Sequence, residues 1–182
     1  MSNYSLSVRE IQESDIDLIT RYWLGSDAQF LKAMGVDPSK IPGKEEWRTM
    51  LMEQIHAPLE EKKSFCIIWQ LDNIPSGHSN INKISFGQEA YMHLHLWNNE
   101  TRRKGVGAAL VKMTLPWFFE KYQLKKLYCE PYALNTPPNK TLEKLGFEFI
   151  KEYITTPGWI NFEQPVKLWQ LTYDSYKEKF GV

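Results

Sequence analysis

The apolar and polar positions at the start of the chain follow two different periods. Residues 4–9 alternate apolar and polar side chains one by one, which is typical of a half-buried strand. From Ser14, a predicted helix cap, apolar residues recur instead at the three- and four-residue steps of a helical face. Helices are therefore predicted over three segments, residues 14–23, 26–34 and 45–56.

The rest of the chain is predicted to be mainly strand. Apolar and aromatic runs bounded by turn residues predict strands over residues 65–71, 74–86, 91–97, 124–130, 147–154 and 166–173. Between them, steps of four, three and four predict one helical face, formed by Val106, Leu110, Met113 and Trp117. Pro116 lies inside this helix, where it should remove a hydrogen bond and bend the axis. A short helix should end before Gly146.

A basic, glycine-rich turn separates the strand at 91–97 from the helix that follows. It contains Arg102, Arg103 and Lys104, followed by Gly105-Val106-Gly107. Glycines allow backbone N–H groups to turn toward an anion, and a helix start adds unpaired N–H donors. These features predict a site for a pyrophosphate. The alternative is an ordinary basic loop that caps a helix, because the turn has neither Walker nor Rossmann spacing.

Two motifs together carry a family resemblance. The Arg-x-x-Gly-x-Gly at 102–107 resembles the acetyl-CoA motif of the GCN5-related N-acetyltransferase (GNAT) superfamily. The second motif, from Asn135 to Leu142-Glu-Lys-Leu-Gly-Phe147, resembles the branch that includes ribosomal-protein N-terminal acetyltransferases. The resemblance implies one α+β domain over residues 1–182. Its mixed, strongly twisted central sheet should be flanked by helices and splayed at an acetyl-CoA cleft.

The resemblance also implies how acetyl-CoA binds. The pantetheine arm should lie against the backbone at the end of the strand, like an added strand, with the pyrophosphate at the glycine-rich turn. Asn135 should hold the arm from the opposite wall, although an Asx turn before two prolines is its alternative role. The expected cofactor-binding residues are Leu96, Trp97, Asn98, Arg102, Arg103, Lys104, Gly105, Val106, Gly107, Ala108 and Asn135.

The candidate catalytic residues are His93, His95 and Tyr132. The two histidines share one strand face, and a neutral imidazole is a natural base near pH 7; the alternative is that they only shape a pocket. Many relatives carry an acidic tyrosine four residues before the Gly-Phe, but Leu142 stands there in this chain, so Tyr132 or solvent must protonate the thiolate. Two further carboxylates, Glu89 and Glu130, are weaker base candidates because carboxylates at strand ends are usually solvated.

Composition limits the partners. Lys plus Arg and Asp plus Glu are 22 each, so the zero net charge argues against nucleic acid or anionic membranes held by bulk electrostatics. Cys66 and Cys129 lie in apolar runs, which indicates reduced core cysteines rather than a disulfide. Without a long apolar run or a signal-peptide core, the protein is predicted to be cytoplasmic.

The resemblance implies an enzyme that transfers the acetyl group of acetyl-CoA to a primary amine by direct attack in a ternary complex. The acceptor could be a protein N-terminus, a polyamine, an amino acid or an antibiotic amine, and the protein a monomer or homodimer. No metal is expected. Two alternatives stay open: a catalytically idle acyl-CoA sensor, and a metal-dependent hydrolase that uses His93 and His95.

Overall fold

A seven-stranded sheet in the order β1-β2-β3-β4-β5-β7-β6 forms the centre of the computed structural model, which describes residues 4–98 and 105–181. Only β4 and β5 pair in parallel among the described strands, so the sheet is mixed, as predicted. The strands are β1 (Leu6–Glu10), β2 (Ser64–Leu71), β3 (Ile74–Ser85), β4 (Glu89–Leu96), β5 (Lys126–Cys129), β6 (Glu148–Thr155) and β7 (Gln164–Thr172).

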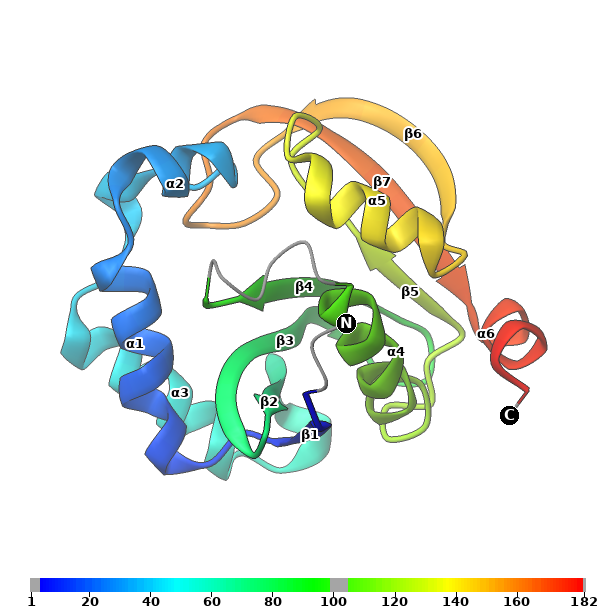
Figure 1. Cartoon of the computed structure of the whole chain (residues 1–182), viewed down its shortest axis with the longest axis horizontal. Coiled ribbons are helices and arrows are strands. Elements are labelled where there is room, and N and C mark those ends of the chain that lie inside the picture. Colours follow the sequence, from blue (N-terminus) through cyan, green and yellow to red (C-terminus); the bar gives the residue numbers. More distant parts are fainter. Residues whose placement is uncertain (1–3, 99–104, 182) are drawn as a thin grey trace.

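Helices flank the sheet in two groups. Figure 1 shows the first three on the left of the molecule and the last three on the right. They are α1 (Ile16–Gly25), α2 (Ala28–Ala33), α3 (Lys44–His56), α4 (Val106–Phe119), α5 (Thr136–Lys144) and α6 (Tyr173–Phe180). This arrangement confirms the α+β fold that the resemblance implied.

The central strand β2 explains why both groups of helices are needed. Its side chains alternate between faces. Phe65 and Ile67 are buried in one apolar core with residues of α4, while Cys66 and Ile68 are buried in a second core with residues of α1, α2 and α3. A strand buried on both faces is expected to be mainly apolar, and the run at 65–71 is apolar apart from Gln70.

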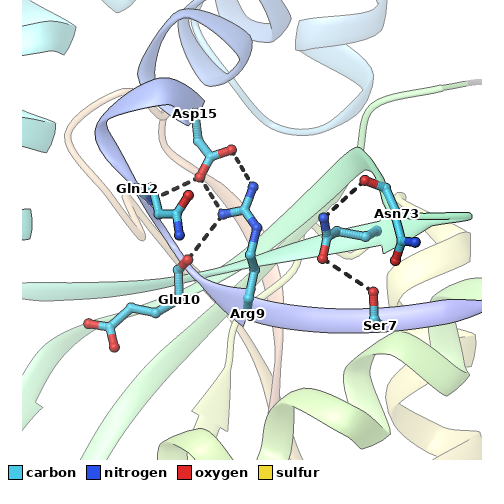
Figure 2. A network of polar contacts seen from close by, with 7 residues as sticks. Ser7, Arg9, Glu10, Gln12, Asp15 and Asn73 are labelled. Atoms are coloured by element: carbon cyan, nitrogen blue, oxygen red, sulfur yellow. Dashed lines mark hydrogen bonds and ion pairs between the residues drawn. The ribbon is translucent and has the colours of Figure 1, made fainter.

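The start of α1 is held by a buried ion pair (Figure 2). The guanidinium of Arg9 donates to both carboxylate oxygens of Asp15, at 2.6 and 2.8 Å. The amide of Gln12 donates to the same carboxylate at 2.8 Å. The prediction that Ser14 caps this helix is therefore wrong. Ser14 lies in the 3-10 turn Glu13–Asp15, and Asp15 takes the capping position. This pair ties α1 to β1.

Two sequence predictions for the second half of the chain are corrected. The predicted face of α4 is only partly buried: Leu110 is enclosed, but Met113 is 38% exposed. The helix packs instead through a wider face that includes Val111 and Leu115, because it is covered on several sides. It continues through Pro116 to Phe119. The C-terminal helix α6 was not predicted; the strand expected over 166–173 ends one residue earlier, at the Thr172 cap.

Candidate active site

The strands β4 and β5 separate partway along their length. Their parallel pairing runs from Glu89↔Lys126 to Tyr91↔Tyr128. Beyond that point β4 continues to Leu96, whereas β5 ends at Cys129. The structure thus confirms the splayed sheet that the resemblance implied, and the gap opens toward the start of α4.

A cavity of about 690 Å³ lies beside this gap. Its floor is formed by β3 and β4, and its walls by α1, α3 and the loop between β6 and β7. Of the predicted site residues, His93, His95, Tyr132 and Asn135 all line it. Candidate residues from β4 and from the segment after β5 therefore line the same cavity.

The floor of the cavity is polar. Side chains from alternate positions of the paired strands β3 and β4 face the cavity, with Asn80 opposite His93 and His78 opposite His95. The His93 Nε2 lies 3.1 Å from the Oδ1 of Asn82. Polar groups on a sheet face that is otherwise apolar indicate a binding or catalytic surface rather than core packing.

His78 is a site residue that the sequence analysis missed. It is buried, and its ring stacks on that of His95 with centroids 4.8 Å apart. The indole N–H of Trp97 donates to its Nδ1 at 2.8 Å. Since an indole only donates, Nδ1 must be unprotonated and the proton of the neutral ring lies on Nε2. His78 lies here because β3 pairs with β4, and the register of that pairing cannot be predicted from the spacing of residues along the chain.

His93 and His95 occupy different environments on β4. Burial lowers the pKa of His93 to about 4, with a further contribution from the Lys83 ammonium. Burial likewise lowers the pKa of His78 to about 3, and neighbouring His93 adds to this shift. His95 packs its ring against the edge of Trp23 at 4.9 Å, with the Tyr22 hydroxyl 3.3 Å from its Nδ1. His93 is therefore neutral near pH 7, in the state required of a base.

Glu130 departs from the expectation that it would be solvated. Its side chain is only 5% exposed and lines the cavity at the end of β5. One carboxylate oxygen accepts a hydrogen bond from the Tyr153 hydroxyl, and the other lies 3.6 Å from the Lys83 ammonium. That ammonium also sits over the Tyr91 ring, 4.5 Å from its centroid. A buried carboxylate that faces a cavity is a ready partner for a cationic ligand.

Tyr132 and Asn135 are positioned by a buried asparagine rather than by their own side chains. Asn139 donates to the carbonyl oxygens of Tyr132 and Asn135, at 3.1 and 2.8 Å, and accepts from the Trp169 indole at 2.8 Å. Asn135 occupies the cap position of α5, but its side chain makes no cap hydrogen bond, so the alternative role as an Asx turn is not observed. Leu142 is fully enclosed in the apolar core, one helix turn beyond Asn139.

The glycine-rich turn enters α4 through a left-handed residue. Gly105 precedes the helix with φ of 78°, a conformation that favours glycine. Gly107 has open space where a Cβ would stand, so packing within the protein does not require glycine there. Val106 is buried and Ala108 half-buried at the same helix start. The predicted cations Arg102, Arg103 and Lys104 lie outside the described residues.

The backbone of β4 presents alternate residues to the gap. The amide of Trp97 donates to the carbonyl of Ser76 on the β3 side, at 2.9 Å. Successive residues of a strand direct their backbone groups to opposite neighbours, so those of Leu94 and Leu96 face the gap. Asn98 follows β4 and is exposed. The Trp97 amide therefore faces β3 rather than the gap, and the expected contacts of Leu96 and Trp97 with acetyl-CoA stay predictions.

Two further properties concern metals and membranes. Within residues 4–98 and 105–181, no three histidine, cysteine, aspartate or glutamate side chains are grouped closely enough to hold a metal ion. None of the helices that the structure describes combines the length and the apolar character needed to cross a lipid bilayer. Both cysteines are buried and free.

Solved structures of several acetyltransferases share this fold. RimL, a ribosomal L7/L12 alpha-N-protein acetyltransferase solved with coenzyme A, has a TM-score of 0.76 at 15% identity over 94% of this chain and 96% of its own. Spermidine N-acetyltransferase from Vibrio cholerae, with CoA and spermine, has a TM-score of 0.76 at 17% identity, covering 94% and 97%. Aminoglycoside acetyltransferase AAC(6')-Ib, with coenzyme A, has a TM-score of 0.75 at 16% identity, covering 98% and 100%.

Sequence comparison identifies the family directly. No curated protein sequence matches the chain significantly. The family model described as the acetyltransferase (GNAT) domain, however, matches residues 5–148. That match covers most of the chain and includes both motifs, the gap between β4 and β5, and the cavity floor. The chain therefore belongs to the GNAT acetyltransferase family.

Proposed function

We propose that this protein transfers the acetyl group of acetyl-CoA to a primary amine by direct attack in a ternary complex. The observation that carries the proposal is the gap between β4 and β5, which is bordered by a cavity with a polar floor and lies on the strand that leads to the glycine-rich start of α4. Structural neighbours solved with coenzyme A support the same co-substrate.

The described residues fit acetyl-CoA at two places. The backbone groups of Leu94 face the gap and would pair with the amides of the pantetheine arm, as an added strand does. The unpaired N–H groups at the start of α4 would bind the pyrophosphate, with Arg102 to Lys104 adding positive charge. The open space at Gly107 supports this, because a side chain would occupy the room that an anion needs. Asn135 would contact the arm from the α5 side.

The reaction needs one base and one acid. The bound ammonium first loses one proton to solvent, because only the neutral amine nitrogen can attack the thioester carbonyl carbon. The C–S bond then breaks, a second N–H proton passes to a base, and the departing thiolate takes up a proton from an acid. We assign Glu130 to binding the acceptor ammonium and neutral His93 to accepting the proton. His95 is held between Tyr22, Trp23 and His78, so it shapes the cavity. Tyr132 lines the same cavity and would protonate the thiolate.

These roles predict different kinetic changes. Glu130→Gln should raise KM for the amine, because it removes the charge that binds the ammonium. His93→Gln should lower kcat by roughly 10²–10⁴-fold with little change in KM for acetyl-CoA. Steady-state kinetics of the two variants, with Glu89→Gln outside the cavity as the matched control, separates them. A wild-type kcat in folded His93→Gln would reject the base assignment.

The acid assignment has its own test. If Tyr132 protonates the thiolate, Tyr132→Phe should lower kcat by roughly 10²-fold or more. If solvent does so, kcat should stay within about twofold of the wild type, well below the change expected for loss of a general acid. The ring contact with Phe162, at 5.9 Å between centroids, is retained in either case.

One observation favours a second candidate function. The position of the usual acid is Leu142, which is fully enclosed in the apolar core and has no titratable group to offer. A protein that binds acetyl-CoA but does not turn it over would act as an acyl-CoA sensor. It would bind acetyl-CoA in calorimetry and release no thiol with any amine.

A further inference from the structure

The walls of the cavity are rich in tryptophan. Trp23 of α1 and Trp47 of α3 lie with centroids 5.8 Å apart and their planes 10° from parallel. Trp159, in the loop between β6 and β7, continues the row at 6.0 Å from Trp47. Trp23 and Trp47 are buried, whereas Trp159 is 54% exposed. Trp159 therefore presents an aromatic face where the cavity wall meets solvent.

Aliphatic side chains complete the walls. They come from α1, the segment after α2, α3 and the loop that carries Trp159, and comprise Ile19, Met34, Val36, Met50, Leu51 and Ile160. Such a surface gains free energy by enclosing an apolar group and loses it by enclosing an unpaired charge. The walls thus favour an acceptor whose body is apolar.

The charged lining residues differ in burial. Glu130, at the end of β5, has a side chain that is only 5% exposed. The other charged lining residues, Glu53, Glu61 and Lys63, are exposed. The lining carboxylates outnumber the lining lysine, so the cavity attracts a cation, and the buried carboxylate binds it at the floor rather than along the walls.

We propose that the acetyl acceptor is a small arylalkylamine, in which a short chain joins one primary amine to an aromatic ring. This inference rests on the proposed function and names its acceptor class. The ammonium pairs with Glu130 at the polar floor, and the ring packs along the apolar walls toward Trp159. A volume of about 690 Å³ suits such a ligand, since small-molecule sites measure roughly 300–1,000 Å³.

The same features disfavour a polyamine. A polyamine carries several ammonium groups along its length, and each needs a carboxylate or water as partner. Apart from Glu130 and the exposed Glu53 and Glu61, the lining that the structure describes has no carboxylate. The walls carry tryptophan and aliphatic side chains and the uncharged amides of Gln54, Asn161 and Gln164. A second ammonium held there would be desolvated without an ion-pair partner, which costs more free energy than ring contacts return.

The first experiment compares acceptors on the wild-type protein. Thiol release from acetyl-CoA, with mass spectrometry of the product, gives kcat/KM for 2-phenylethylamine, ethanolamine, spermidine and an alanine-initiated tripeptide. The kcat/KM for 2-phenylethylamine should exceed that for ethanolamine by about 10- to 200-fold, the range for burying one ring. A higher kcat/KM for spermidine or the tripeptide than for 2-phenylethylamine would overturn the inference and leave the proposed function standing. Failure of every amine would overturn the proposed function.

The second experiment tests Trp159 itself. Trp159→Ala should lower kcat/KM for 2-phenylethylamine about 10-fold and leave that for ethanolamine unchanged, because only the ring loses a partner. Trp159→Phe should recover most of the loss. Ile154→Ala is the matched control: Ile154 is 70% exposed on β6 and outside the cavity lining. Equal losses with both amines in Trp159→Ala, or the same discrimination as wild type, would overturn the assignment of the ring to this wall.

Discussion

Replacing Asp15 by asparagine should destabilise the protein strongly while leaving its shape nearly unchanged. The Asp15 side chain is 2% exposed and receives two hydrogen bonds from Arg9 and one from the Gln12 amide. An asparagine keeps one oxygen acceptor but turns an NH₂ toward the guanidinium (Figure 2). The variant thus leaves the Arg9 charge without its counter-ion at the start of α1.

The size of the effect follows from burial. Removing one partner of a buried pair costs about 3–5 kcal/mol, and the lower end applies because the Arg9 side chain keeps 27% exposure. A loss of about 3 kcal/mol in a chain of 182 residues corresponds to a fall in Tm of about 6–12 °C. Thermal and urea denaturation followed by circular dichroism would measure it.

The control is a second ion pair on the same helix. Asp17 lies 3.4 Å from the Lys44 ammonium, and both side chains are more than half exposed, at 58% and 61%. Asp17→Asn should therefore change stability by at most about 1 kcal/mol. The double variant Arg9→Met/Asp15→Asn should recover part of the loss, because no unpaired charge remains. Equal Tm values for Asp15→Asn and Asp17→Asn would refute the reasoning.

The remaining predictions concern pH and the glycine-rich turn. The pKa of His93 is lowered to about 4 and that of His78 to about 3, so the unfolded state binds more protons than the folded state below pH 6.5. The free energy of unfolding should therefore be highest above pH 6.5 and fall as pH decreases. Denaturation curves should show that the free energy of unfolding falls by about 1.4 kcal/mol per pH unit for each histidine, and His93→Gln should remove the contribution of His93. An unchanged slope in that variant would contradict a neutral, buried His93. Gly105→Ala should lower the free energy of unfolding by about 1 kcal/mol, because Gly105 has a positive φ. Gly107→Ala should instead stabilise the helix by roughly 0.5–1 kcal/mol and yet weaken acetyl-CoA binding in calorimetry. Tighter or unchanged acetyl-CoA binding in Gly107→Ala would argue against a bound anion at that helix start.

The sequence predicted the fold well where periodicity was strong. The strands at 65–71 and 74–86 and their tight turn are present, and Asp72 and Asn73 take positive φ angles of 51° and 64° as a two-residue hairpin requires. The face of α4 was less predictable, because a helix buried on several sides has no narrow apolar stripe. The helix α6 was missed because its charged residues and aromatic residues do not separate into a long periodic pattern.

The sequence could group candidate residues that lie on one strand, but not residues that come together from different strands. His93 and His95 were found because side chains alternate along β4. His78 and Asn82 reach the same floor through the register of β3, and the Glu130 carboxylate is contacted by Tyr153 of β6 and Lys83 of β3. Contacts of this kind depend on tertiary packing, so no local pattern reports them. The tryptophan wall arises in the same way, from α1, α3 and the loop after β6.

If acetyl-CoA binds at the start of α4, acetyl transfer should be lost when a side chain blocks that helix start. Purified wild-type protein and Gly107→Glu are incubated with acetyl-CoA and 2-phenylethylamine, ethanolamine, spermidine and a tripeptide, while free thiol and acetylated amine are quantified together. The wild type should release thiol and acetylated amine in equal amounts, and Gly107→Glu should give neither product despite an unchanged Tm. Binding of acetyl-CoA by the wild type without any acetylated amine, or full turnover by Gly107→Glu, would contradict it.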